Sequence, residues 1–589
     1  MSVAGAAPRW DLSPFFPNVR STEFRDAAKK LERTIIENEA YWDSESITSG
    51  GPSSASVLAV AIDSLNSLLD QSRLISSYLE CLVTTDSKDD ASAAALSEFD
   101  NLTVRLQKLQ TRFALWVAGF DLDGAAKANR TVAEHQFALR KEQVRARHLM
   151  DPRLESLVSD LALSGSVAWS RLHSNLTSQI QVEVGGKSMP MPAVRNLAYE
   201  ADRDIRQRAY EAELEAWKKN EVSISACLNG IKGEVNTLSR SRNWGSPLAE
   251  ALFNASIDQA TLDVMMAAAL KSFPMFRRYL KAKAKVLGLP KLAFFDLFAP
   301  VGKGSKSWEY SEGSAFVAEN FGRYSQKMGD FANKTFRENW IDAEARGGKV
   351  DGAYCTPLRN GESRILMNYD PSYGSVSTLA HELGHAYHDQ CLSRRTLINQ
   401  DTPMTLAETA SIFCETIVKE AALESVGPED QLAILEASLQ GQCQVVVDIT
   451  SRYLFERAVF DKRLMRELSA AEFSLLMLDA QKQTYGDGLD EDQLHPYMWA
   501  VKPHYYSTYS FYNFPYMFGL LFGLGLYSVY QSDPEPFRDR YDELLSSTGI
   551  ANAPTLAEGF GIDLRSEEFW AASLAQIGAD VERFEALTN

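Results

Sequence analysis

Three of the chain's eight histidines lie in one short stretch, STLAHELGHAYHDQC, which runs from Ser377 to Cys391. His381 and His385 are four residues apart, so a helix would place both imidazoles on one face, one turn apart. Two imidazoles in that arrangement can bind one zinc ion. Glu382 follows His381 directly and could contact a water on the metal rather than the metal itself. The spacing therefore predicts a zinc site at which Glu382 is the general base that activates water for attack on a carbonyl.

A catalytic zinc ion needs three protein ligands and one open position, so a third ligand has to be found. His388 is near in sequence, but a helix would carry its ring away from the point where the other two rings converge. A second predicted helix, Thr402 to Ala422, contains Glu408 among small and apolar neighbours and Glu415 two turns later. A carboxylate among such neighbours usually needs a partner such as zinc, whereas a surface Glu at a helix start is favoured by the helix dipole. The residues alone leave both interpretations of Glu408 open.

A tyrosine-rich segment, WAVKPHYYSTYSFYNFPYMFG, contains His504. The histidine is followed by Tyr505, Tyr506, Tyr509, Tyr512 and Tyr516. Water attack on a peptide carbonyl creates an oxyanion, which a tyrosine hydroxyl or a histidine N–H can stabilise. At this density most of the tyrosines are expected to pack in a core, and one or two to take part in catalysis.

The segment SRILMNY, Ser363 to Tyr369, is a predicted strand because glycines and an Asn-Gly pair surround it. It precedes the predicted metal helix. A strand in that place could pair with an extended peptide substrate through its backbone, in particular at Met367, Asn368 and Tyr369. A structural edge strand explains the pattern equally well.

Most of the remaining sequence has apolar residues at helical spacing. Long helices fill about the first 180 residues, and Ser21 and Thr22, followed by Glu23, form a predicted N-cap. The pattern breaks at QIQVEVGGKSMPMP, residues 179–192, which predicts a short hairpin or a linker, with a domain boundary near it. We expect a mainly α fold with an N-terminal helical lobe over residues 1–190 and a catalytic domain over 191–589. The apolar stretch from Phe511 to Tyr527 is interrupted by a proline and is interpreted as a buried segment rather than a membrane span.

The composition argues against several partners. The net charge is −18, from 60 basic and 78 acidic side chains, and such a surface repels phosphate backbones and anionic lipids. The six cysteines form no CxxC pair, and the N-terminus has no charged region followed by an apolar run. We therefore expect a cytoplasmic protein with free thiols, without a nucleic-acid or membrane partner and without an obligate protein partner.

Motifs spread along nearly the whole chain resemble the oligoendopeptidase F family, a branch of the thimet oligopeptidase-like zinc peptidases. The matching motifs are PRWDLSPFF, FFDLFAP, GAYC with ILMNYD, LAHELGHAYHDQ, LAETASIFCE and HYYSTYSFYNFPYMFG. The match is specific in the catalytic half and loose in the first 180 residues. The resemblance implies two helical lobes around a deep substrate channel that admits short unstructured peptides, with a small β element beside the zinc helix.

The resemblance also implies roles for single residues. His381, His385 and Glu408 match the zinc ligands and Glu382 the general base. Glu415 and His388 match a carboxylate and a histidine that surround the ligands without binding the metal. In the late segment His504 and Tyr509 match by their spacing, and Tyr512 and Tyr516 match as alternatives for the hydroxyl that reaches the oxyanion.

We therefore predict an endopeptidase that binds one zinc ion per chain and hydrolyses internal bonds of short oligopeptides. Two alternatives remain open. One is a zinc carboxypeptidase with a similar helical channel, which would trim peptides from a free C-terminus. The other is a catalytically silent peptide-binding protein, which would have lost a ligand or the base, and neither is lost in this sequence.

Overall fold

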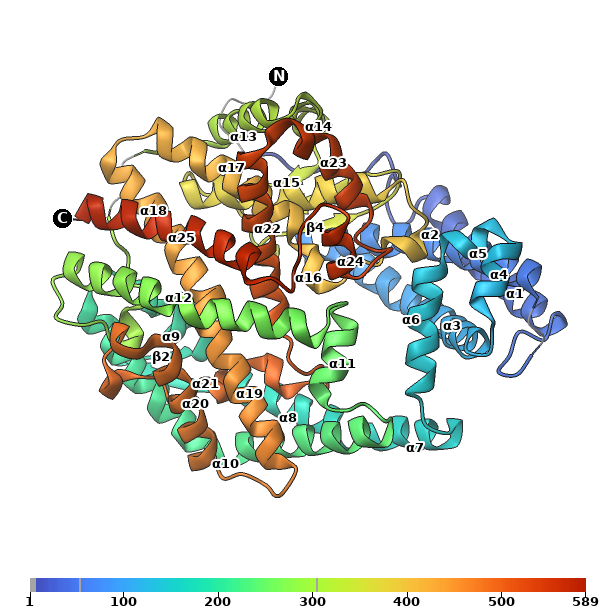
Figure 1. Cartoon of the computed structure of the whole chain (residues 1–589), viewed down its shortest axis with the longest axis horizontal. Coiled ribbons are helices and arrows are strands. Elements are labelled where there is room, and N and C mark those ends of the chain that lie inside the picture. Colours follow the sequence, from blue (N-terminus) through green and yellow to red (C-terminus); the bar gives the residue numbers. More distant parts are fainter. Residues whose placement is uncertain (1–6, 52–53, 303, 305, 589) are drawn as a thin grey trace. The chain divides into compact units, whose positions relative to one another are not determined.

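A computed structural model describes residues 7–51, 54–302, 304 and 306–588 (Figure 1). The described chain is built mainly from α-helices with five short strands, which confirms the predicted fold class. The first residues of the N-terminus, to which the expectation of a missing signal sequence refers, lie outside the described part. The described residues form two compact units. Unit 1 comprises Met1–His148, Lys306–Glu424 and Val529–Gly561, and unit 2 comprises Leu149–Ser305, Ser425–Ser528 and Ile562–Asn589.

Unit 1 is built from helices around a small sheet. Its helices are α1 (Thr22–Ser44), α2 (Ala55–Thr85), α3 (Asp90–Val117), α4 (Leu122–Ala128), α5 (Arg130–Glu134), α6 (Gln136–Arg147), α13 (Tyr310–Tyr324), α14 (Gln326–Arg337), α15 (Tyr373–Leu392), η3 (Leu397–Gln400), α16 (Met404–Ala407), α17 (Thr409–Ser425), α23 (Pro534–Ser546) and α24 (Ala553–Glu558). The predicted cap at Ser21 is confirmed, because its side chain accepts a hydrogen bond from the Phe24 amide. Helices α1 to α3 bury one apolar face each in a shared core that includes Ile35, Trp42, Tyr78 and Phe113.

The sheet of unit 1 has three strands in the order β3-β5-β4. The central strand β5 (Ser363–Leu366) runs parallel to β3 (Ile341–Asp342) and antiparallel to β4 (Tyr354–Pro357). All four residues of β5 are buried, because neighbours cover both of its edges and both of its faces. The predicted strand is therefore confirmed over its first half and ends three residues earlier than expected.

Helix α15 carries the HELGH motif and begins directly after this sheet. Its N-cap Ser372 accepts a hydrogen bond from the Ser375 amide, which fixes where the helix starts. The helix lies against α13, α23, β4 and β5 (Figure 1). Twelve of its residues are buried, so packing on several sides holds the motif in place.

Unit 2 is also mainly helical. Its helices are α7 (Pro152–Ala162), α8 (Ser166–Gln179), α9 (Met191–Asn196), η1 (Leu197–Tyr199), α10 (Arg203–Ser241), α11 (Pro247–Asn254), α12 (Gln259–Val286), η2 (Phe294–Asp296), α18 (Pro428–Cys443), the π-helical η4 (Gln444–Asp448), α19 (Ile449–Arg463), α20 (Ala470–Tyr485), η5 (Gly486–Gly488), η6 (Glu491–Gln493), α21 (Met498–Val501), η7 (Pro503–Tyr506), α22 (Phe514–Ser532) and α25 (Glu567–Thr588). The last residues of α22 belong to unit 1.

The predicted hairpin is present in unit 2. Strands β1 (Gln181–Val184) and β2 (Lys187–Pro190) pair antiparallel across Gly185 and Gly186. Both glycines have positive φ angles, 59° and 78°, which the two-residue turns of hairpins require. The hairpin therefore lies inside unit 2, whose first segment begins at Leu149, and the division of the chain at residue 190 stays a prediction.

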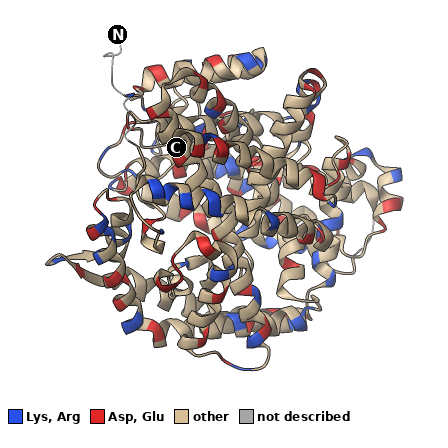
Figure 2. Cartoon of the chain, turned by 60° about the vertical axis from the view of Figure 1, so that its left-hand side comes forward, with Lys and Arg blue, Asp and Glu red and all other residues tan. Residues whose placement is uncertain are grey.

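The apolar segment that forms α22 is buried along most of its length, as the sequence predicted. No helix in the described part of the chain combines the length and apolar character that crossing a membrane needs. Acidic and basic residues are interspersed over the helices (Figure 2).

Candidate metal centre

The two histidines of the HELGH motif project from one face of α15. Their ring centroids are 4.9 Å apart, with the ring planes at 79°. Each side chain is about a quarter exposed, so the pair is reachable from solvent. Helical spacing alone produces this arrangement, as the sequence predicted.

Glu408 meets both imidazoles. Its Oε2 atom lies 3.2 Å from Nε2 of His381 and 3.4 Å from Nε2 of His385. Among the described residues, these three form the one group of His, Cys, Asp or Glu side chains whose potential ligand atoms lie close enough together to hold a metal ion. The structure therefore brings together the two predicted histidine ligands and the carboxylate that the residues alone had left open.

Glu408 does not lie within one continuous helix, although the sequence predicted a helix from Thr402 to Ala422. The helix is broken into α16 and α17, and Glu408 stands between them with φ −88° and ψ 5°. Side chains compete with the helical pattern here, since Thr409 Oγ1 donates to the Leu406 carbonyl and Ser411 Oγ donates to the Glu408 carbonyl. Ser411 Oγ also lies 2.7 Å from Glu408 Oε2, which fixes the direction of the carboxylate.

A glycine allows α15 to approach this segment closely. A Cβ atom on Gly384 would lie 2.6 Å from Cα of Ser411 and 2.7 Å from the Ala410 carbonyl oxygen. Both distances are far below ordinary contact, so only glycine fits at this crossing. Gly384, one of the three residues between the two histidines of the motif, thus sets the separation of the two elements that carry the predicted ligands.

Glu415 contacts the second ring nitrogen of His381, Nδ1. Its Oε2 atom lies 3.2 Å from Nδ1, and Ser377 Oγ donates to its Oε1 at 2.9 Å. A carboxylate can only accept, so Nδ1 carries a proton, and Nε2 is the nitrogen that faces Glu408 and can bind a metal once its own proton is lost. This is the tautomer that a metal-binding histidine needs.

The charges around His381 favour a cation at this place. Burial alone would lower the pKa of His381, but hydrogen bonds to Glu408 and Glu415 raise that pKa to about 10. Burial alone would raise the pKa of Glu408, whereas hydrogen bonds from the two histidines lower it far below its usual range. The protein thus stabilises a positive charge between these groups, and without a metal a proton takes that role.

Glu382 differs from the other carboxylates of the site. It is buried, and its Oε2 atom has no hydrogen-bond partner within the described residues. Burial raises the pKa of Glu382, and the charges of His381 and His385 partly oppose this. A buried carboxylate oxygen without a partner is costly, so it is expected to face water or substrate in the working protein.

His388 points away from the ligand group into the interior of unit 1. Its Nε2 atom lies 3.1 Å from the Leu545 carbonyl oxygen and 2.9 Å from Thr548 Oγ1. Burial lowers the pKa of His388 to about 4, so the ring is neutral at pH 7. The structure thus gives it a packing and hydrogen-bonding position.

Three residues beside the site were not singled out from the sequence. Ser377 and Ser411 bind the two carboxylates as described above. Asp389 accepts a hydrogen bond from Ser363 Oγ at 2.8 Å, and burial raises the pKa of Asp389 to about 6. A regular spacing could have revealed two of the three, because Ser377, His381, His385 and Asp389 follow one another every four residues along one face of α15.

The predicted peptide-binding segment lies beyond the end of β5. The amides of Met367 and Tyr369 donate to the carbonyls of Asp342 and Ala343, and Lys349 Nζ donates to the Met367 carbonyl. The Asn368 side chain donates to the Val350 carbonyl at 3.0 Å. These backbone groups already have partners in unit 1, and the pairing of this segment with a substrate stays a prediction.

The tyrosine-rich segment belongs to unit 2 and is described there by itself. Tyr505 and Tyr506 are buried packing residues, and Tyr506 donates to the Trp499 carbonyl. Tyr509 is 49% exposed, and Tyr512 and Tyr516 are half-buried with their hydroxyls 3.4 Å apart. The structure thus separates two core tyrosines from three accessible ones.

His504 has a defined tautomer. Its Nδ1 atom lies 3.2 Å from Asn513 Oδ1, which also accepts a hydrogen bond from Arg452 at 3.0 Å. Because arginine can only donate, the contacting atom of Asn513 is its oxygen, and His504 Nδ1 carries the proton. Burial lowers the pKa of His504, so Nε2 is an acceptor at neutral pH.

Comparisons with known proteins identify the family of this chain. The model of peptidase family M3 matches residues 196–576. Oligopeptidase PepF of Bacillus subtilis is 25% identical over 400 residues, which cover 67% of this chain and 59% of that protein. An oligoendopeptidase F homolog of Lactococcus lactis is 25% identical over 66% of this chain and 65% of its own length. The matches thus span less than two thirds of these relatives.

Solved structures share the fold. A Chlamydophila abortus protein superimposes with a TM-score of 0.84 at 18% identity, over 98% of both chains. Oligoendopeptidase-F from Enterococcus faecium gives a TM-score of 0.68 at 18% identity, over 96% of this chain and 98% of that one. With the family model matching well over half of the sequence, including the HELGH helix and Glu408, the chain belongs to peptidase family M3.

Proposed function

We propose that the chain is a zinc-dependent endopeptidase that hydrolyses internal bonds of short oligopeptides. Membership of peptidase family M3 and the names of the relatives support peptide hydrolysis. The observation that carries the proposal is the His381–His385–Glu408 group with the buried, unpartnered Glu382 oxygen beside it. A helix that is rich in histidine but has no catalytic role would have no use for a buried carboxylate oxygen without a hydrogen-bond partner.

The three predicted ligands fit a zinc ion in their spacing and chemistry. Two ligand atoms of a tetrahedral zinc site, each about 2.0–2.2 Å from the metal, lie roughly 3.3 Å from each other. Glu408 Oε2 is 3.2 Å and 3.4 Å from the two imidazole nitrogens, so a metal could enter with small adjustments. Zinc bound there would supply Lewis acidity and lower the pKa of a bound water toward neutrality.

We propose that Glu382 transfers a proton from the attacking water to the leaving amine. Its Oε2 takes a proton from the attacking water and then delivers it to the nitrogen of the leaving amine. Burial helps this role, because it raises the pKa of Glu382 toward neutrality and so balances acceptance and release of the proton. Glu415 does not touch the substrate in this scheme, and it keeps His381 in the required tautomer.

A tyrosine is a better proposed donor to the oxyanion than His504. His504 uses its Nδ1 proton for Asn513, which leaves an acceptor at Nε2. Tyr509, Tyr512 and Tyr516 are exposed or half-buried, and a tyrosine hydroxyl is able to donate. Replacing the active tyrosine with Phe is expected to lower kcat about 10²–10³-fold, as for other oxyanion donors, and the same change in the two other tyrosines serves as the control.

The proposed setting is cytoplasmic, with short unstructured peptides as substrates. All six cysteines are free thiols, five of them buried, which suits a reducing compartment. The net charge of −18 and the mixing of both signs along the helices (Figure 2) do not suit a nucleic-acid partner.

The test is mass spectrometry of the products from a peptide blocked at both ends, with chelator, and with zinc added back. Internal cleavage that follows the metal is expected. Trimming of a peptide with a free C-terminus, without cleavage of the blocked one, would indicate a carboxypeptidase instead. The variant Glu382→Gln should bind zinc and lose cleavage, whereas Glu424→Gln, an exposed residue near the end of α17, should keep both. Full activity of Glu382→Gln would refute the proposed base.

A further inference from the structure

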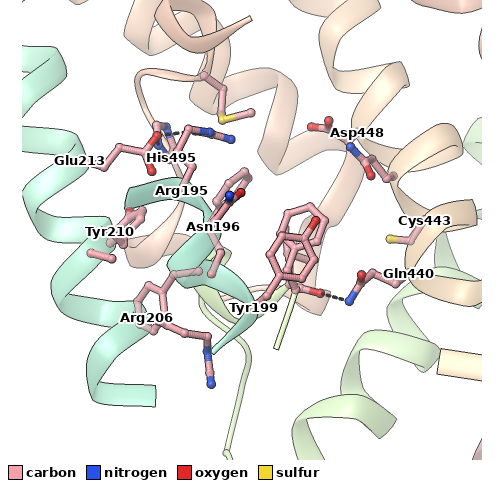
Figure 3. A pocket seen from close by; sticks show the side chains of 18 of the residues that line it. Arg195, Asn196, Tyr199, Arg206, Tyr210, Glu213, Gln440, Cys443, Asp448 and His495 are labelled. Carbon is pink, nitrogen blue, oxygen red and sulfur yellow. Dashed lines mark hydrogen bonds and ion pairs between the residues drawn. The ribbon is translucent and has the colours of Figure 1, made fainter. Parts of the chain in front are cut away.

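We propose that a partly open cavity of unit 2 binds a small carboxylate with an apolar or aromatic side group, the chemistry of a free hydrophobic amino acid. The cavity has a volume of about 220 Å³ and lies among α9, α10, α12, the junction of α18 and α19, and the segment that leads to His504 (Figure 3). All of its lining residues belong to unit 2. It contains none of the residues assigned to the metal centre.

The charges in the cavity leave one cation without a partner. Arg195 pairs with Glu213, as the dashed line in Figure 3 shows, and Arg206 pairs with Asp296 at 2.9 Å. Asp448 is bound by Arg452 at 2.9 Å. Within the described residues, the Nζ atom of Lys502 has neither a hydrogen bond nor an ion pair. A partly open pocket with one unpaired ammonium group is suited to a ligand with one negative charge.

The pKa of Lys502 also favours an anionic ligand at this place. Burial and the nearby charge of Arg452 lower the pKa of Lys502 to about 7. A carboxylate in the cavity would favour the charged form and remove that penalty. The carboxylates of Asp448 and Glu213 oppose this lowering only in part, so a bound carboxylate would give Lys502 a closer anionic partner.

A second polar group in the cavity wall also lacks a partner. His495 is 1% exposed, and its Nδ1 atom has no hydrogen-bond partner among the described residues. Its Nε2 atom lies 3.3 Å from Glu213. Buried polar atoms are nearly always satisfied in folded proteins, so an unpaired one in a cavity wall indicates a ligand or an ordered water.

Several aromatic side chains in the wall suit an apolar group. Tyr199, Tyr210, Phe295 and Phe298 line the cavity, and the Tyr199 and Phe298 rings are 5.2 Å apart. The volume is below the roughly 300–1,000 Å³ of sites for drug-sized ligands, which favours a ligand the size of one amino acid. One wall also contains a π-helical turn, η4, and such turns occur often at functional sites.

The cavity is connected to His504 by a short series of contacts. Asp448 in its wall binds Arg452, Arg452 donates to Asn513, and Asn513 accepts from His504. Lys502 precedes His504 by two residues. If the proposed function is correct, a ligand here is placed to alter turnover, and a free amino acid is a final product of peptide breakdown. The binding itself does not depend on that function.

The test is isothermal titration of the full chain with L-phenylalanine, 3-phenylpropionate and 2-phenylethylamine. Both carboxylates should bind one per chain, and the amine, which lacks the carboxylate, about tenfold more weakly or not at all. Lys502→Met should weaken the binding of both carboxylates about tenfold or more. Lys482 is an exposed lysine of α20, and Lys482→Met should leave their binding unchanged. Tyr199→Ala should also weaken phenylalanine, and since Tyr199 is 57% exposed this change should not disturb folding.

Two results would overturn the proposal. One is no binding of either carboxylate at millimolar concentration, or equal binding by folded Lys502→Met and the unchanged protein. The other is competition between phenylalanine and a blocked peptide on zinc-loaded Glu382→Gln, which would make the cavity part of the peptide site. Because these titrations do not use cleavage, they remain informative even if the endopeptidase proposal fails.

Discussion

The close approach of α15 to α17 at Gly384 leads to a sharp prediction for Gly384→Ala. The added methyl group would lie 2.6 Å from Cα of Ser411 and 2.7 Å from the Ala410 carbonyl oxygen. Both neighbours are backbone atoms, so no side chain can rotate away to make room. Helix α15 and the start of α17 must therefore move apart.

The size of that movement follows from ordinary contact distances. Carbon atoms pack at about 3.5–4.0 Å, so the two segments must separate by roughly 1 Å. Glu408 Oε2 now lies 3.2 Å and 3.4 Å from the two imidazole nitrogens, and a tetrahedral zinc site needs about 3.3 Å. A shift of that size spoils the geometry for zinc, and the overpacking itself costs about 1–3 kcal/mol of stability.

Zinc affinity, measured by competition with a coloured chelator, and thermal unfolding together test this reasoning. The control is Gly374→Ala on the same helix, where the new Cβ would meet only Ser372 Oγ, at an ordinary 3.5 Å. We expect Gly384→Ala to lose at least about tenfold in zinc affinity, as changes beside metal ligands typically do, and Gly374→Ala to lose none. Equal affinity of the two variants would show that the crossing does not set the ligand geometry.

Two further predictions concern carboxylates. Glu415→Gln should weaken zinc binding about 10–100-fold, because the partner that fixes the His381 tautomer loses its charge. Competition with a chelator measures the zinc affinity, and the exposed Glu424→Gln is the control. A loss of affinity below about twofold would contradict this prediction. Despite burial, Arg195 and His495 lower the pKa of Glu213 from 4.5 to about 2. Its stabilising effect is therefore complete above pH 4.5 and lost as the pH falls toward 2. Glu213→Gln should cost on the order of 3 kcal/mol at pH 7 and less at pH 4 in urea unfolding, whereas an equal cost at both pH values would count against this ion pair.

Local sequence signals predicted the local structure well. Helical periodicity, the cap at Ser21 and the Gly-Gly hairpin depend on neighbouring residues, and the structure has all three. The two units depend on contacts between segments hundreds of residues apart. A single sequence contains no periodic signal for such contacts, so the discontinuous units could not be predicted from it.

The same limit applies at the site. The spacing of His381 and His385 fixes their common face without any tertiary information. The break at Glu408 and the unsatisfied oxygen of Glu382 arise from packing between elements, and neither could be predicted. The tautomer of His504 depends on Arg452, which is 52 positions away in sequence, so the choice between histidine and tyrosine as oxyanion donor required the structure.

The seven-residue spacing of Glu408 and Glu415 has a physical reason. Two helical turns rise about 10.5 Å. One imidazole ring with a hydrogen-bond length of 3.2 Å on each side takes up most of that span. The two carboxylates can therefore hold His381 from its two nitrogens, one on the metal side and one behind it. Because the angles of Glu408 stay near the helical region, the break turns its side chain toward both histidines while the spacing to Glu415 is nearly kept. The residue that interrupts the helix can thus serve as a ligand without giving up the partner that orients the ring.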